Sequence, residues 1–187
     1  HHISWLDIPV VLATVPGTFV SKAEVAHWPL IGWLARRGGT LFVQRGQGEA
    51  TLAVANTMTD HLADGRTLVL FPEGTTTIGG APRHFHPRLF QAPIRAARPV
   101  WPLALHYPPP RGDGCHPRVP YVGDDRFLPH GWRLLGEAGI TVHLRFTAPL
   151  AAAGQPRRKL ADAAHAAVSA QLAPTLRNTN LSLESAA

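Results

Sequence analysis

The sequence predicts an α/β fold in which a mostly parallel central sheet is flanked by helices. Three observations lead to this expectation. Strand-like segments alternate with helix-like segments along the 187 residues, which is typical of sheets built from strand–helix–strand units. Residues 67–71 form a nearly continuous apolar run, as in a strand buried on both faces of a parallel sheet. The chain is 45% hydrophobic and only 16% charged, which suits a single domain with a sizeable core.

The first helix is expected over residues 8–15, which are apolar and follow Asp7. Asp7 can act as the N-cap of this helix, and Pro9 suits its first turn. Pro16-Gly17 then ends the segment. Apolar and polar side chains alternate over residues 18–21, which predicts a short strand.

The middle of the chain continues the alternation. Residues 24–37 predict a second helix that is interrupted at Pro29, and residues 41–43 predict a second strand. The helix expected over residues 49–63 has the most regular pattern, because its apolar side chains recur at helical spacing. The strand over residues 67–71 follows and runs directly into a turn.

The C-terminal half contains three expected helices and two expected strands. The helices are expected over residues 88–97, 132–138 and 158–172, and the strands over residues 100–106 and 140–146. Pro102 lacks a backbone N–H, so it should lie at an edge, a bulge or the start of its strand. Residues 108–120 are rich in Pro and Gly and predict a loop. We expect one domain, residues 1–175, and a tail, residues 176–187, that is frayed from residue 178.

Composition favours anionic partners other than nucleic acid. The formal net charge is +6, which suits phosphate-bearing lipids or an anionic membrane face. The basic residues are scattered and do not alternate with aromatic ones, so no nucleic-acid partner is expected. The single cysteine, Cys115, excludes a disulfide framework. The chain opens inside a motif and without Met, so we expect that an N-terminal part is missing, including a strand and helices.

The spacing of His2 and Asp7 points to acid–base chemistry. A histidine five positions before an aspartate can place an imidazole against a carboxylate, and such a pair can remove a proton from an alcohol. The spacing alone is weak, because His1-His2 could also be the remnant of an affinity tag. Ser4 offers a rival reading as a hydrolase nucleophile, but no glycine flanks it as the Gly-x-Ser-x-Gly turn requires.

Three polar sites follow the ends of expected strands, where ligands bind in α/β sheets. Lys22 and Arg45 are cations that follow the first and second strands, and Glu73–Thr77 follows the third. Gly74 can adopt a positive φ, so that backbone N–H groups converge on an anion, and Thr75 adds a hydroxyl. Glu73 would repel a phosphate, so we expect it to hold the loop, or Arg45, in place.

Four short blocks occur in order along the chain: residues 2–7 (HISWLD), 40–46 (TLFVQRG), 71–75 (FPEGT) and 100–103 (VWPL). They resemble the NHxSxxD, FxxR, EGT and proline-containing motifs of the glycerolipid acyltransferase family, whose best-known members are 1-acyl-sn-glycerol-3-phosphate acyltransferases. Residues 19–24 and 28–32 also look like family segments. The resemblance extends from residue 1 to about residue 150, and it makes a tag remnant a poor explanation of His2.

The resemblance implies an O-acyltransferase. The family transfers an acyl chain from an acyl thioester, either acyl-CoA or acyl carrier protein, to the hydroxyl of a lysophospholipid. The expected acceptor is lysophosphatidic acid, which would give phosphatidic acid. His2 would be the general base and Asp7 would orient it, while Lys22, Arg45 and the Glu73-Gly74-Thr75 turn would hold the head group. No metal or other cofactor is expected, and the enzyme would work on a membrane surface, at its cytoplasmic face.

Two departures from the family pattern keep alternatives open. His1 occupies the usual asparagine position, and Thr76 and Thr77 follow Thr75 where relatives often have arginine. One expected cation is therefore missing, which leaves acylation of a lyso-ornithine lipid open. A non-catalytic lipid-binding fragment is a third reading, since the strand that should precede His2 is absent.

Two further clusters have both a structural and a functional interpretation. His84, His86 and His106 lack the HExxH pattern of a metal site, so solvated or core histidines are favoured over ligands. A membrane-facing patch could also form near residues 28–37. Packing on the sheet is slightly favoured there, because Pro29 and Gly32 disrupt an amphipathic helix. The patch would contain Trp28, Leu30, Ile31, Trp33, Leu34 and Arg36-Arg37.

Overall fold

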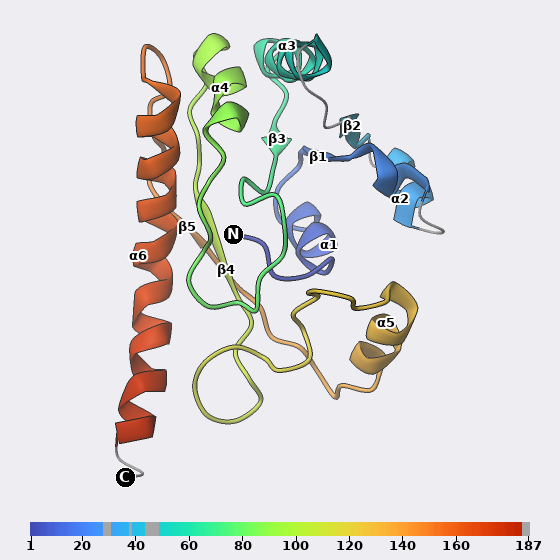
Figure 1. Ribbon diagram of the computed structural model, residues 1–187, viewed down its shortest axis with the longest axis vertical. Coiled ribbons are helices and arrows are strands. Elements are labelled where there is room, and N and C mark those ends of the chain that lie inside the picture. The colour runs from blue at the N-terminus through green and yellow to red at the C-terminus, as the bar shows by residue number, and fades with distance from the viewer. Residues whose placement is uncertain (28–30, 38, 44–48, 185–187) are drawn as a thin grey trace.

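The computed structural model describes residues 1–27, 31–37, 39–43 and 49–184, and it has the predicted α/β architecture (Figure 1). Within these residues the strands form two sheets rather than one. A parallel three-stranded sheet has the order β2-β1-β3, and β4 pairs antiparallel with β5. The strands are β1 (Thr18–Lys22), β2 (Leu41–Val43), β3 (Leu68–Val69), β4 (Leu103–His106) and β5 (His143–Phe146).

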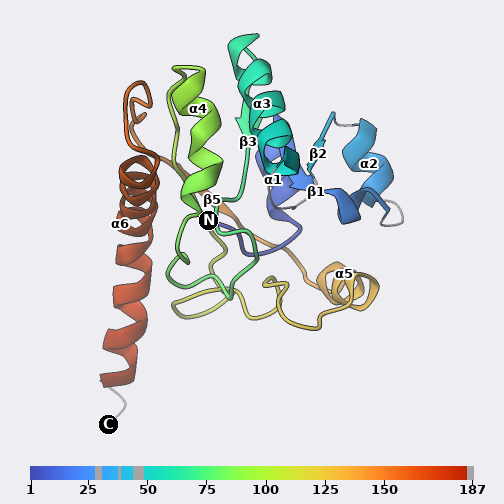
Figure 2. The ribbon, with the colours of Figure 1, turned by 45° about the horizontal axis from the view of Figure 1, so that its top comes forward.

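Helices flank both sheets. Figure 2 shows α6 and α4 on one side of the molecule and α2 on the other. The α-helices are α1 (Asp7–Leu12), α2 (Ile31–Arg37), α3 (Glu49–Ala63), α4 (Gln91–Arg95), α5 (Phe127–Leu135) and α6 (Arg157–Glu184), and 3-10 turns cover Ala23–His27 and Pro87–Phe90. In the described part of the chain, no helix is both long and apolar enough to cross a membrane.

The parallel sheet confirms two predicted strands and corrects the third. β1 is central, with Val20 opposite Leu41 of β2 and Thr18 opposite Leu68 of β3. The strand predicted over residues 67–71 contains only two strand residues, and both are half-buried rather than buried on both faces. The reason is that both residues line a cavity, so their side chains are not fully covered.

The first helix differs from the prediction at both ends. It begins at Asp7 and ends at Leu12, not Val15, and the N-cap residue is Leu6, which makes no side-chain cap. The Asp7 carboxylate does not cap because it turns back to the N–H groups of Ile3 and Ser4.

The helices on either side of residues 28–30 follow the predicted break in part. The segment predicted as one interrupted helix consists of a 3-10 turn, Ala23–His27, and α2. Pro29 lies outside the described residues. The helix predicted over residues 49–63 is confirmed at both ends as α3.

The C-terminal half shows where sequence patterns misplace boundaries. Pro102 directly precedes β4, which confirms the strand-start alternative. α5 begins at Phe127 rather than at residue 132, because Pro129 lies in its first turn, where proline is tolerated. The helix predicted over residues 88–97 is a 3-10 turn followed by the short α4. α6 continues to Glu184, past residue 178 where fraying was expected.

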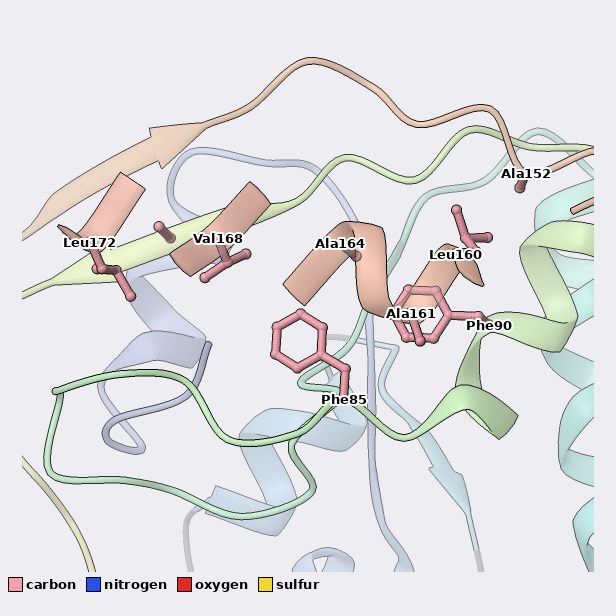
Figure 3. Packing of buried hydrophobic residues seen from close by; sticks show 9 residues of the cluster. Phe85, Phe90, Ala152, Leu160, Ala161, Ala164, Val168 and Leu172 are labelled. Atoms are coloured by element: carbon pink, nitrogen blue, oxygen red, sulfur yellow. The ribbon is translucent and has the colours of Figure 1, made fainter. Parts of the chain in front are cut away.

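Two hydrophobic clusters hold these layers together. In the first, Phe85 and Phe90 pack against α6 at Leu160, Ala164 and Val168 (Figure 3). The small alanine faces of α6 let it approach these aromatic rings closely.

The second cluster surrounds the predicted catalytic segment. It joins Ile3 and Val11 to Phe19 of β1 and to Leu105 of β4. The start of the chain is therefore packed between elements of the two sheets, which fixes the backbone on either side of His2 and Asp7.

Candidate active site

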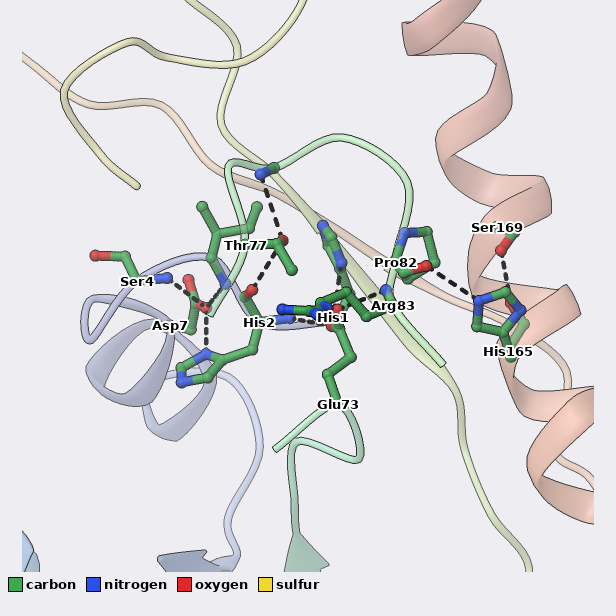
Figure 4. Close-up of polar contacts among 12 residues, drawn as sticks. His1, His2, Ser4, Asp7, Glu73, Thr77, Pro82, Arg83, His165 and Ser169 are labelled. Atoms are coloured by element: carbon green, nitrogen blue, oxygen red, sulfur yellow. Dashed lines mark hydrogen bonds and ion pairs between the residues drawn. The ribbon is translucent and has the colours of Figure 1, made fainter. Parts of the chain in front are cut away.

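His2 and Asp7 lie in direct contact, as their spacing predicts. His2 Nδ1 is 2.7 Å from Asp7 Oδ2 (Figure 4). Asp7 is fully buried, whereas the His2 side chain keeps 16% of its surface exposed. A carboxylate can only accept, so Nδ1 carries a proton and donates a hydrogen bond to Asp7. In the neutral imidazole the other ring nitrogen, Nε2, then carries no proton and can act as a base.

Asp7 is fixed by three further donors. Its Oδ2 accepts from the backbone N–H groups of Ile3, at 2.6 Å, and Ser4, at 3.0 Å. Its Oδ1 accepts from the hydroxyl of Tyr107, at 2.7 Å. These contacts leave the carboxylate little freedom to rotate, so the fixed carboxylate sets the orientation of the His2 ring. Tyr107 has no counterpart in the sequence prediction, because its partner lies 100 positions away.

The His2 ring also rests on an aromatic surface. It stacks on Phe71 with the ring centroids 3.8 Å apart and an interplanar angle of 12°. Phe71 in turn stacks near Phe19 of β1. The end of the third predicted strand thus supports the imidazole from the side, while Asp7 holds it by hydrogen bonding.

Glu73 connects the turn after β3 to the start of the chain. The side chain is buried, and Oε1 accepts from the backbone N–H of His2 at 2.8 Å, while Oε2 accepts from that of Arg83 at 2.7 Å. His1 Nδ1 lies 3.4 Å from Oε1. Glu73 therefore holds the backbone N–H groups of His2 and Arg83, and its expected part in the head-group site remains a prediction.

The residues after Glu73 divide into structural and exposed ones. Gly74 has φ +70°, as its predicted role in the turn requires. Thr77 binds the carbonyl of His2 through both its N–H, at 2.9 Å, and its hydroxyl, at 3.2 Å, and the Thr76 hydroxyl donates to the carbonyl of Tyr121. Thr75 is exposed, so its side chain is accessible from solvent.

The two predicted cations have different outcomes. Lys22 is the last residue of β1, and its backbone is in register with Val43 of β2. Arg45 lies outside the described residues. Their proposed binding of the acceptor therefore remains a prediction.

Trp5 connects the catalytic segment to α5. Its Nε1–H donates to Nδ1 of His130 at 3.0 Å, and the other ring nitrogen of His130 lies 3.1 Å from the carbonyl of Pro120. Because indole can only donate, His130 accepts at Nδ1 and donates at Nε2 to that carbonyl. The sequence carries no signal for this arrangement, since its partners come from three distant segments.

The rival readings of Ser4 and the histidines gain no support. Ser4 is fully buried, and its hydroxyl oxygen accepts from the N–H of Leu6. His84 and His86 are exposed. Burial is the largest cause that lowers the pKa of His106, and the charges of His143, Arg145 and His1 lower it further. Across the described ranges, no group of three or more His, Cys, Asp or Glu is placed to hold a metal ion.

A family model named Acyltransferase matches residues 1–106. The chain belongs to the acyltransferase family. The match contains His2, Asp7 and the turn at Glu73, whereas Tyr107 and His130 lie beyond it.

Three named relatives show what this chain is similar to. Lyso-ornithine lipid O-acyltransferase of Pseudomonas aeruginosa is 45% identical over 170 residues, which cover 90% of this chain and 64% of that protein. The protein of the same name from Rhizobium meliloti is 35% identical, and the match covers 78% of this chain and 54% of that protein. The 1-acyl-sn-glycerol-3-phosphate acyltransferase of Neisseria meningitidis is 30% identical, and the match covers 78% of this chain and 56% of that protein. The chain thus spans between 54% and 64% of the length of these three relatives.

A solved structure shares the fold of this chain. The crystal structure of the 1-acyl-sn-glycerophosphate (LPA) acyltransferase PlsC from Thermotoga maritima aligns with a TM-score of 0.65 and 21% identity, covering 93% of this chain and 63% of that one. The likeness confirms the predicted fold class.

A cavity of about 540 Å³ adjoins the candidate site, between β3 and β4. Its walls are mostly apolar and come from both sheets and from helices α3 and α6. Phe71, which supports the His2 ring, is one of the lining residues, and so is His1.

Proposed function

We propose that the chain carries the catalytic machinery of a lysolipid O-acyltransferase. The observation behind the proposal is the His2–Asp7 contact, in which a fully buried carboxylate with three other donors orients an imidazole. The acyl donor is a thioester, acyl-CoA or acyl carrier protein, and the acceptor is a membrane lipid with one free hydroxyl. The enzyme acts at a membrane surface, on its cytoplasmic face.

The reaction needs one proton acceptor and two aligned substrates. His2 Nε2 removes the proton of the acceptor hydroxyl while its oxygen attacks the thioester carbonyl. The new C–O bond forms, the C–S bond breaks, and the departing sulfur takes the proton from the His2 imidazolium. Asp7 stabilises that imidazolium and keeps the tautomer, as in serine hydrolases, but the substrate alcohol replaces the enzyme serine. This route needs no metal or redox cofactor, because no electron is transferred and the base is a side chain.

We infer that lyso-ornithine lipid is the preferred acceptor. The hydroxyls of Thr76 and Thr77, which follow Thr75 in place of a cation, bind backbone carbonyls within the protein. The turn therefore offers less positive charge than a phosphate ester would favour. The higher identity to the lyso-ornithine lipid enzyme, 45% against 30%, supports the same choice over lysophosphatidic acid. Lys22, Arg45, Gly74 and the exposed Thr75 would hold the head group, with Glu73 fixing the turn that carries Gly74 and Thr75.

Acyl transfer by the purified 187-residue chain tests the proposal. The chain is incubated with acyl-CoA or with acyl carrier protein and with lyso-ornithine lipid, lysophosphatidic acid or lysophosphatidylcholine, and the acylated products are quantified by mass spectrometry. We expect transfer to lyso-ornithine lipid to be the fastest. His2→Ala should lower the rate by roughly 100- to 10,000-fold, the usual contribution of a general base.

His84→Ala is the matched control, because it removes an exposed histidine outside the dyad. It should leave the rate unchanged. Full activity of His2→Ala would eliminate the proposed base, and an acyl adduct on Ser4 would show a covalent route instead. Faster transfer to lysophosphatidic acid would refute only the choice of acceptor. Lipid binding without any transfer would identify a binding protein.

A further inference from the structure

Helix α5 presents an unusually apolar outer face. Leu128, Trp132 and Leu135 are each 79% exposed, which makes them the most exposed large hydrophobic residues in the described part of the chain. Their spacing of four and three positions places them on one side of the helix. Figure 1 shows α5 at the margin of the molecule, beyond α1 and away from α6. An apolar stripe of this size in water points to a binding partner.

The inner face of α5 already has its partners. His130 and Leu134 are buried, and Phe127 packs edge-on against Trp5 with the ring centroids 5.0 Å apart. The bond from Trp5 to His130 adds a polar contact to the same face. The stripe of Leu128, Trp132 and Leu135 is therefore a second apolar face, separate from the one that holds the helix to the protein.

The side chains of the stripe fit a lipid interface. Charges of both signs flank it, since Arg126, Arg133 and Asp124 are exposed and Arg133 pairs with Asp125. The stripe itself contains no charged side chain. Leucine and tryptophan are the side chains that interfacial helices bury at the level of the lipid head groups, where the indole N–H stays hydrated. The net charge of +6 attracts the whole chain to an anionic bilayer.

We propose that the outer face of α5 docks on an anionic membrane, with Leu128, Trp132 and Leu135 inserted at its interface. This inference rests on the proposed function, since it names the surface through which the enzyme reaches its lipid acceptor. Trp5 lies three residues from His2 and is held by α5. Docking through α5 therefore brings the catalytic dyad close to the lipid head groups.

Vesicle binding without substrates tests the docking surface. The 187-residue chain is mixed with vesicles of phosphatidylglycerol and phosphatidylethanolamine, and the bound fraction is measured by flotation. Trp132→Ser should lower the partition coefficient about tenfold, and the triple Leu128→Ser, Trp132→Ser, Leu135→Ser variant about 100-fold or more, from the transfer free energy of such side chains. Trp132→Phe should bind almost as well as the unchanged chain.

Trp101→Ser is the matched control, because it removes another exposed tryptophan, 59% exposed, from outside α5. It should bind vesicles normally, and all variants should have unchanged circular dichroism. Quenching by lipids labelled on the acyl chain should be weaker in Trp132→Phe than in the unchanged chain.

Three outcomes separate this inference from the proposed function. Normal vesicle binding by the triple variant refutes the docking surface. A dimer that the triple variant abolishes, in a chain that does not bind vesicles, shows that a second copy covers the stripe and also refutes it. Acyl transfer to an acceptor kept below its critical micelle concentration reports on catalysis alone. The triple variant should retain that activity, and loss of vesicle binding supports docking even if no lysolipid is acylated.

Discussion

The hydroxyl of Tyr107 donates a hydrogen bond to Asp7 Oδ1 over 2.7 Å, and both side chains are almost completely buried. Asp7 Oδ2 is meanwhile shared by His2 Nδ1 and two backbone N–H groups. Each carboxylate oxygen thus has its own set of donors. Tyr107 directly follows β4, so this bond connects the antiparallel sheet to the catalytic segment.

Replacing Tyr107 by phenylalanine should weaken both stability and catalysis. The substitution keeps the ring but leaves Asp7 Oδ1 buried without a donor, which costs roughly 1–3 kcal/mol. We expect a lower free energy of unfolding in urea and a lower kcat, with the KM for the acceptor nearly unchanged. Tyr121→Phe is the matched control, since Tyr121 contacts the site through its backbone. Equal effects of the two substitutions would argue against a specific role of Tyr107.

The hydrogen bond between Tyr107 and Asp7 should also make the unfolding free energy depend on pH in the alkaline range. Burial above all, and then the charge of Asp7 and the hydrogen bond to it, raise the pKa of Tyr107 far above its ordinary value of 10.0. Between these two pKa values the unfolded chain loses the phenol proton and the folded chain keeps it, so stability falls as pH rises above about 10. The loss should approach about 1.4 kcal/mol per pH unit.

The Tyr107→Phe variant lacks this ionisation and should lose less stability over the same range. Denaturant unfolding of both proteins between pH 8 and 11 measures the difference. The unchanged chain should have the higher unfolding free energy at pH 8, and this difference from Tyr107→Phe should shrink above pH 10. A difference that stays constant would contradict the assigned pKa direction.

The sequence predicts those parts of the site that lie close together along the chain. The His2–Asp7 contact spans five positions, and Glu73 and Gly74 belong to one turn, so spacing and turn chemistry are enough to locate them. Tyr107 and His130 could not be found this way. Each reaches the catalytic segment from more than 95 positions away, and only the packing of the layers brings them there.

The fold shows the same division between local and distant information. α3 was predicted at both ends because its pattern is periodic and local. The parallel sheet was expected to extend further, but β4 and β5 pair antiparallel and separately from it. Strand pairing depends on contacts between distant segments, which side-chain alternation does not encode. The separation into residues 1–175 and a tail remains a prediction.

Glu73→Gln should destabilise the turn that carries the site. The carboxylate accepts from the N–H groups of His2 and Arg83 with its two oxygens. Glutamine can accept with only one, and its NH2 group would face the other donor. We expect a loss of roughly 1–3 kcal/mol in unfolding free energy and a reduced kcat.

Asp64→Asn is a suitable control for Glu73→Gln, because it makes the same chemical change at an exposed pair with Arg66. Its effect on unfolding should stay within about 0.5 kcal/mol. If Glu73→Gln were equally harmless, the two backbone contacts would contribute little to the site.

Two threonines of the same turn should respond differently to valine, which keeps the shape and removes the hydroxyl. Thr75 is exposed, whereas the Thr77 hydroxyl donates to the carbonyl of His2 at 3.2 Å and accepts from the N–H of Gly79 at 3.4 Å. Thr75→Val should raise the KM for the lysolipid acceptor a few-fold and leave the unfolding free energy unchanged, because a bond to the head group is lost only in the complex. Thr77→Val should lower the unfolding free energy by about 1–3 kcal/mol, because it removes two internal hydrogen bonds, each worth about 0.5–1.5 kcal/mol. Steady-state kinetics and urea unfolding of the two variants distinguish these roles. A normal KM for Thr75→Val would remove Thr75 from the proposed head-group site, while leaving the His2–Asp7 chemistry untouched.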